Sequence, residues 1–165
     1  MNVDVLHGLK VASDEAALRR LGGEAVARGW AREGYVEALL KREKEYPTGI
    51  AAVAARVALA HADPEWVVEP GLLAAALAVP VSFRRMEDPS QTIDVDTIFL
   101  MLIDKPEEHL TMLRQLVGLV QDPRFPAWRS ALTAVLLEDS LAGKKYGQEH
   151  PDEADAPLGC PTPPR

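Results

Sequence analysis

The sequence predicts a single domain of the α/β class, on three observations. Apolar residues recur at helical spacing in two segments near the N-terminus and in two more after residue 105. Between these segments lie three apolar runs that we interpret as buried or half-buried strands. The chain has 165 residues, which falls within the ~100 to 200 residues of a single domain and argues against two separately folded domains.

The first two predicted helices are bounded by residues with clear physical roles. Ser13 is a typical N-cap, and Gly29 is a typical residue at a helix end. The second helix is expected from about residue 31 to Tyr46, because Pro47 prevents its continuation. The apolar face of the first helix is Ala17, Leu18, Leu21 and Ala25.

Three strands are predicted in the middle of the chain. Residues 53–59 are rich in alanine, so periodicity alone does not separate helix from strand there, and the context favours a strand. Residues 72–83 form a second apolar run. Residues 95–103 form a third, which is rich in the β-branched and aromatic residues that strands prefer.

Two helices and a tail are predicted for the rest of the chain. Pro106 opens a helix and Pro126 opens another that ends near Gly143. The residues after Gly143 are polar and hold five of the thirteen prolines, so they cannot offset the entropy lost on ordering. We therefore expect a folded domain over residues 1–143 and a flexible Pro-rich tail over residues 144–165. The apolar stripe of the Pro106 helix is expected to be Leu110, Leu113, Val117 and Val120, and the Pro126 helix carries Leu132, Val135 and Leu136.

Composition excludes several classes of protein. The formal charge of −7, with cations scattered among acids, argues against a nucleic-acid binder. Cys160 is the only cysteine, which excludes an intrachain disulfide and a thiolate metal site and suits a reducing cytoplasm. No stretch reaches the ~18 uncharged apolar residues of a membrane span. We expect a cytoplasmic protein without direct membrane insertion.

The sequence lacks the motifs of nucleotide-binding, serine hydrolase and metal sites. The chain has no Gly-rich phosphate loop and no nucleotide fingerprint, and it lacks the Gly-x-Ser-x-Gly elbow of serine hydrolases. Its four histidines are too widely separated for a close set of metal ligands. We therefore expect no metal and no cofactor. The four are His7, His61, His109 and His150.

The segment from Arg42 to His61 is the most informative part of the chain. With three further segments in the same order, it resembles the enzyme IIA domains of the bacterial phosphoenolpyruvate-dependent sugar phosphotransferase system, in the galactitol-like branch of the fructose-mannitol superfamily. The resemblance covers roughly residues 4–142. The matching residues are Arg42-Glu43 with Tyr46-Pro47-Thr48-Gly49-Ile50, Val57 to Glu65, Pro80 to Phe83 with Met86, and Glu108-His109-Leu110 with Leu113.

The resemblance implies a mixed β-sheet flanked by helices on both sides and a phosphocarrier function. In this family an active histidine takes a phosphoryl group from the phosphocarrier protein HPr. It passes the group to a cysteine of enzyme IIB, which serves the membrane component IIC in sugar or polyol uptake. On this resemblance His61 is the phosphoryl acceptor, and Arg42 and His109 are its helpers.

One residue departs from the family pattern. Family members usually place proline before the acceptor histidine, whereas this chain has Ala60 there. Proline would fix φ and remove one N–H group. Two alternatives stay open: a regulatory module switched by phosphorylation of His61 that moves no sugar, and an interaction scaffold that has lost phosphorylation.

The same residues suit phosphoryl transfer on chemical grounds. An imidazole attacks phosphorus only when neutral, and its other nitrogen needs an acceptor, either a backbone carbonyl or a carboxylate. A guanidinium from Arg42 and peptide N–H groups at Thr48 and Gly49 would stabilise the phosphoryl oxygens. His109 lies in the first helical turn, where the dipole favours an anion.

Each of these residues also has a structural interpretation. His61 can be a core histidine, and Arg42 and His109 can be exposed residues among helix carboxylates. Thr48 and Gly49 can serve only the turn.

Overall fold

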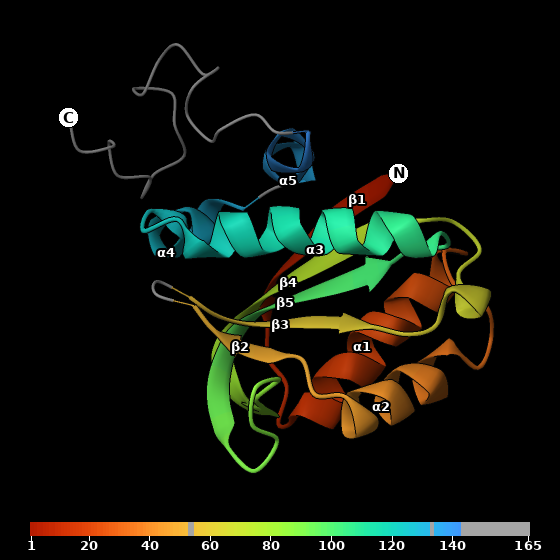
Figure 1. The fold of residues 1–165 in the computed structure, drawn as a ribbon, viewed down its shortest axis with the longest axis horizontal. Helices are drawn as coiled ribbons and strands as arrows, with labels where there is room; N and C mark the ends of the chain where they lie inside the picture. The colour runs from red at the N-terminus through yellow and green to blue at the C-terminus, as the bar shows by residue number, and fades with distance from the viewer. Residues whose placement is uncertain (53–54, 133, 143–165) are drawn as a thin grey trace.

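The computed structural model describes residues 1–52, 55–132 and 134–142 (Figure 1). The predicted tail over residues 144–165 lies outside these residues, so it stays a prediction, whereas the last described helix ends at Leu141, close to the expected end near Gly143. Two short gaps, at residues 53–54 and at 133, separate the described ranges.

A five-stranded mixed sheet forms the centre of the domain (Figure 1). Its strands lie in the order β1-β4-β5-β3-β2. β1 is parallel to β4 and β3 is parallel to β5, whereas the β4–β5 and β2–β3 pairs are antiparallel. The strands are β1 (Asn2–Leu9), β2 (Gly49–Ala51), β3 (Arg56–His61), β4 (Gly71–Arg84) and β5 (Thr92–Leu102).

Helices cover both faces of this sheet, which confirms the α/β class (Figure 1). One core lies under α1 and α2, and the other lies under α3 and α5. Successive residues of β3 alternate between the two cores, with Ala58 in the first and Leu59 in the second. A strand buried on both faces must be apolar throughout, which explains the continuous apolar runs. The helical segments are α1 (Asp14–Ala27), α2 (Tyr35–Glu45), η1 (Pro64–Trp66), α3 (Pro106–Gln121), α4 (Phe125–Trp128), η2 (Arg129–Ala131) and α5 (Ala134–Leu141).

Several local predictions are confirmed. Ser13 caps α1, because its side-chain oxygen accepts a hydrogen bond from the N–H of Ala16 at 3.1 Å. The three predicted strands exist with shifted bounds as β3, β4 and β5. α2 ends at Glu45, close to the expected stop before Pro47, but it begins at Tyr35 because Gly34 has a φ of +93° that no helix residue adopts.

Other local predictions are wrong or incomplete. β1 and the three-residue β2 were not predicted. The helix expected from Pro126 is divided into α4, η2 and α5. The buried stripe of α3 is Met112, Leu116 and Val120, whereas the predicted stripe began at Leu110, which is 49% exposed.

Candidate functional site

His61 is the last residue of β3, so the strand carries its imidazole from the buried sheet to the sheet's end. Its Nδ1 lies 3.1 Å from the carbonyl oxygen of Leu59. A carbonyl oxygen only accepts hydrogen bonds, so Nδ1 carries the ring proton and Nε2 holds the free lone pair. The acceptor that sequence left open is thus a backbone carbonyl.

The other two predicted catalytic residues lie beside His61. His109, in the first turn of α3, packs edge-on against it, with the ring centroids 4.5 Å apart and the planes at 74°. Arg42, near the C-terminal end of α2, stacks its guanidinium over the Tyr46 ring at 4.6 Å. Its Nη1 also lies 3.6 Å from Oδ1 of Asp63, which follows His61 in the chain.

Arg42 retains an unused donor in this cluster. Its Nε is buried and has no hydrogen-bond partner among the described residues. A buried donor without a partner is costly, and most such groups in native proteins are satisfied. Donation from this N–H to an anionic oxygen would require the Arg42 side chain to move, because the atom is buried.

The electrostatics of the cluster keep both rings neutral. Burial, reinforced by the charges of His109 and Arg42, lowers the pKa of His61 to about 4, against the opposing effect of the Leu59 carbonyl. Burial and the charge of Arg42 also lower the pKa of His109. A neutral His61 with its lone pair on Nε2 is a nucleophile at physiological pH.

The structure engages Thr48 with another residue. Its peptide N–H donates to Oε1 of Glu43 at 3.0 Å, and its hydroxyl donates to Oε2 at 2.7 Å. Both side chains are buried, with Glu43 8% and Thr48 2% exposed. A phosphate contact through Thr48 would require these donors to leave Glu43, so that role stays a prediction.

Gly49 has a clear structural requirement. It begins β2, which runs so close to β4 that a Cβ at residue 49 would lie 2.6 Å from the carbonyl oxygen of Arg84. Any side chain there would force the two strands apart. The glycine therefore fixes the backbone that leads toward the site, and its phosphate contact stays a prediction.

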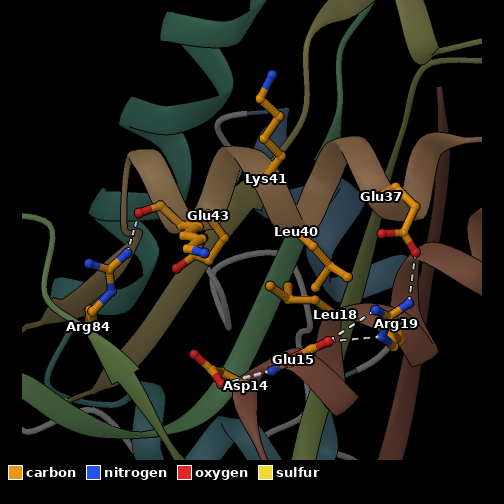
Figure 2. Close-up of a pocket in the computed structure, with 10 residues that line it drawn as sticks. Asp14, Glu15, Leu18, Arg19, Glu37, Leu40, Lys41, Glu43 and Arg84 are labelled. Carbon is orange, nitrogen blue, oxygen red and sulfur yellow. Dashed lines mark hydrogen bonds and ion pairs between the residues drawn. The ribbon is translucent and has the colours of Figure 1, made fainter.

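A separate groove of about 620 Å³ lies between α1 and α2 (Figure 2). Figure 2 shows Arg19 bonded to Glu15 and Glu37 along one side, with Glu43 and Arg84 toward the other. His61, His109 and Arg42 do not line it. The reactive cluster thus lies outside this groove.

Sequence reasoning missed the residues that hold the cluster together. Asp63 and Tyr46 contact Arg42, and Glu43 holds Thr48. Asp63 carries a usable signal, since a carboxylate two residues after the acceptor histidine is placed near any cation that serves it. Apart from its place in the matching Arg42-Glu43 pair, Glu43 carries none, because its neighbours make it look like one more exposed helix carboxylate.

A family model described as "Phosphoenolpyruvate-dependent sugar phosphotransferase system, EIIA 2" matches residues 2–134. The chain belongs to this family. It is similar to the galactitol-specific EIIA component of Escherichia coli (strain K12), with 25% identity over 122 residues that cover 74% of this chain and 81% of that protein.

Solved structures of enzyme IIA proteins share the fold. One is the complex of enzyme IIAMTL and phosphorylated enzyme IIBMTL from Escherichia coli, with a TM-score of 0.66, 24% identity, and coverage of 85% of this chain and 94% of that one. Another is the nitrogen regulatory protein IIA-Ntr from Neisseria meningitidis, with a TM-score of 0.62, 22% identity, and coverage of 86% and 91%.

Family membership confirms the resemblance to enzyme IIA domains and the predicted class of activity. This enzyme IIA protein is a phosphotransferase component with a phosphocarrier role. Within the described residues, no helix is both long and apolar enough to cross a bilayer. The same residues contain no group of three or more histidine, cysteine, aspartate or glutamate side chains that could hold a metal ion.

Proposed function

We propose that His61 accepts a phosphoryl group from HPr on Nε2 and passes it to an enzyme IIB, in the uptake of a sugar or a galactitol-like polyol. The observation that carries the proposal is a neutral His61, tied at Nδ1 to the Leu59 carbonyl, beside an arginine with an unused N–H. The relatives named for galactitol support uptake over the regulatory alternative. The proposal places the protein in the cytoplasm with its partners.

In the proposed step the Nε2 lone pair forms a bond to phosphorus while the bond from phosphorus to the donor's nitrogen breaks. The donor nitrogen keeps that electron pair, and the positive charge passes to the His61 ring. The Nδ1–H bond to Leu59 stabilises this charge, because the carbonyl dipole faces the ring. No proton needs to leave Nδ1 during the transfer.

Arg42 and His109 support the step in different ways. The buried Nε of Arg42, which has no partner among the described residues, is proposed to turn toward an equatorial phosphoryl oxygen and donate to it, where charge is concentrated in the transition state. His109 closes one side of the His61 ring and presents a donor near the helix N-terminus, a position that favours anions. Gly49 is proposed as a further phosphate contact, and Thr48 only if its donors leave Glu43 after the group has been transferred.

Incubation with phosphoenolpyruvate, enzyme I and HPr tests the acceptor residue. The parent protein should gain an acid-labile, base-stable phosphate, and His61→Ala should gain none. His7→Ala is a matched control, since His7 is an exposed histidine on β1. Labelling of His61→Ala at the parent rate would refute the assignment of His61.

The onward step has its own test. The phosphorylated chain is mixed with an enzyme IIB of the galactitol type, and loss of label from the chain is followed with its appearance on IIB. We expect transfer within the time of the labelling reaction. Stable label on His61 with no transfer to IIB would favour the regulatory alternative.

A further inference from the structure

The β2–β3 ladder ends with half of a hydrogen-bonded pair. In an antiparallel sheet, the residues of such a pair exchange two bonds, each donating its N–H to the other's carbonyl. Thr48 and Leu59 occupy the next position after the Gly49 and Ala58 pair. The Leu59 N–H donates to the Thr48 carbonyl at 3.2 Å, as this pattern requires.

The reciprocal bond is diverted by Glu43. The N–H of Thr48 should donate to the Leu59 carbonyl, but it donates to Oε1 of Glu43 at 3.0 Å. The carboxylate is held in place by the Thr48 hydroxyl at 2.7 Å. The Leu59 carbonyl accepts from Nδ1 of His61 in place of Thr48. Glu43 thus binds the N–H that would otherwise compete with the His61 ring for the Leu59 carbonyl.

Glu43 is an expensive residue for a purely structural bond. It is 8% exposed, and no ion pair reaches it from the described residues. The charged groups that face it are Asp14 from α1 and Arg84 from β4. A buried carboxylate without a cation costs stability, which suggests that the site gains something from it.

We propose that Glu43 is a positioning residue for phosphoryl transfer: by capturing the Thr48 N–H it leaves the Leu59 carbonyl to His61, which keeps the proton on Nδ1 and the lone pair on Nε2. This inference rests on the proposed function of His61. The tautomer itself exists whether or not the protein is phosphorylated. The two claims can therefore fail separately.

The test combines nitrogen-15 NMR of the His61 ring, near neutral pH, with single-turnover phosphoryl transfer from phosphorylated HPr. In the parent protein His61 should be a single Nδ1–H tautomer. In Glu43→Ala the Thr48 N–H is free to pair with the Leu59 carbonyl and competes with the ring. We expect a substantial Nε2–H population and transfer slowed at least about tenfold, because the attacking lone pair is misplaced.

Two variants separate positioning from folding. Glu43→Gln should recover the parent tautomer and most of the rate, because its amide oxygen accepts from the Thr48 N–H and its amide nitrogen donates to the Thr48 hydroxyl. Glu45→Ala removes an exposed carboxylate from the same helix and should change neither readout. Thr48→Val removes the hydroxyl bond alone and should give a smaller shift of the same sign, which keeps the test valid if Glu43→Ala does not fold.

The outcomes are distinct. A folded Glu43→Ala protein with the parent tautomer and rate would overturn the inference, even with a lower melting temperature. If Glu43→Ala does not fold, a Thr48→Val protein with the parent tautomer would overturn it. If His61 takes no label in the parent, the proposed function fails, and the NMR comparison still decides whether Glu43 sets the tautomer.

Discussion

The His61 cluster and the groove between α1 and α2 use the same helix, α2, in opposite ways. In the groove, Arg19 bonds to two carboxylates at 2.9 and 3.0 Å, and Arg84 donates to the carbonyl of Lys44. In the cluster, Arg42 has one contact to a carboxylate at 3.6 Å and a buried Nε without a partner among the described residues. The groove is a hollow of about 620 Å³, but these two cations are already satisfied there. Of the three arginines, only the one in the cluster has a buried side-chain N–H without a partner among the described residues.

The largest expected effect is the loss of Arg42. Arg42→Ala should slow labelling of His61 by up to about a hundred- to a thousandfold, which corresponds to about 2.7 to 4 kcal/mol of barrier for one preorganised donor. Arg42→Lys should recover part of this loss, because an ammonium lacks the planar fork. Single-turnover transfer from phosphorylated HPr measures both, with circular dichroism to confirm folding. A parent rate for Arg42→Ala would show that the unused donor has no role in transfer.

A smaller effect is expected for His109. His109→Ala removes the ring that covers one side of His61 and admits water there. Because burial is the main cause of the low pKa of His61, that pKa should rise toward its ordinary value. Phosphoryl transfer should also slow, by about tenfold, because the His109 ring is no longer positioned beside His61. NMR titration of His61 and the transfer rate check both effects. An unchanged titration would show that His109 does not shield the ring.

The groove contains one group whose titration affects stability. Burial raises the pKa of Glu43 from 4.5 to about 7, with Asp14 adding to the rise and Thr48 and Arg84 opposing it. The folded protein therefore binds a proton that the unfolded chain releases above 4.5. Stability from this group is full below that pH and is lost as the pH rises through about 7.

Glu43→Gln cannot titrate and should avoid this loss. Its melting temperature relative to the parent should rise by several degrees between pH 5 and pH 7, as pK shifts of this kind amount to a few kcal/mol. Thermal melts of both proteins across this range measure the difference. A constant difference would mean that Glu43 stays ionised throughout.

The smallest effect is expected for Arg19. Arg19→Ala removes two exposed ion pairs from the groove, and exposed pairs contribute little to stability. Labelling of His61 should equal that of the parent, and the melting temperature should change only slightly. The labelling assay measures the first effect and a thermal melt measures the second. A clear loss of labelling would show that the groove takes part in transfer.

The sequence predicted the elements whose signals are local. Ser13 and Pro47 marked helix ends, and the continuous apolar runs marked strands buried on both faces. β1 was not predicted because it is an edge strand with polar residues and only partial burial. β2 was not predicted because a segment of three residues is too short to show a periodic pattern.

The site shows the same limit. His61, His109 and Arg42 were predicted from the family resemblance, and the structure brings them together. The Leu59 carbonyl and Glu43 could not be predicted, because their roles depend on how one ladder ends. No residue type in the sequence indicates that the Thr48 N–H fails to bond to the Leu59 carbonyl.

The bond from Nδ1 of His61 to the Leu59 carbonyl leaves a single lone pair on the ring, at Nε2. Donor and acceptor proteins must therefore reach the same atom, one before and one after the group is transferred. In-line displacement at phosphorus gives them the same approach, so the two cannot occupy the protein together. Under the proposed function, transfer between them follows ping-pong kinetics, and an excess of unphosphorylated enzyme IIB inhibits labelling by HPr competitively.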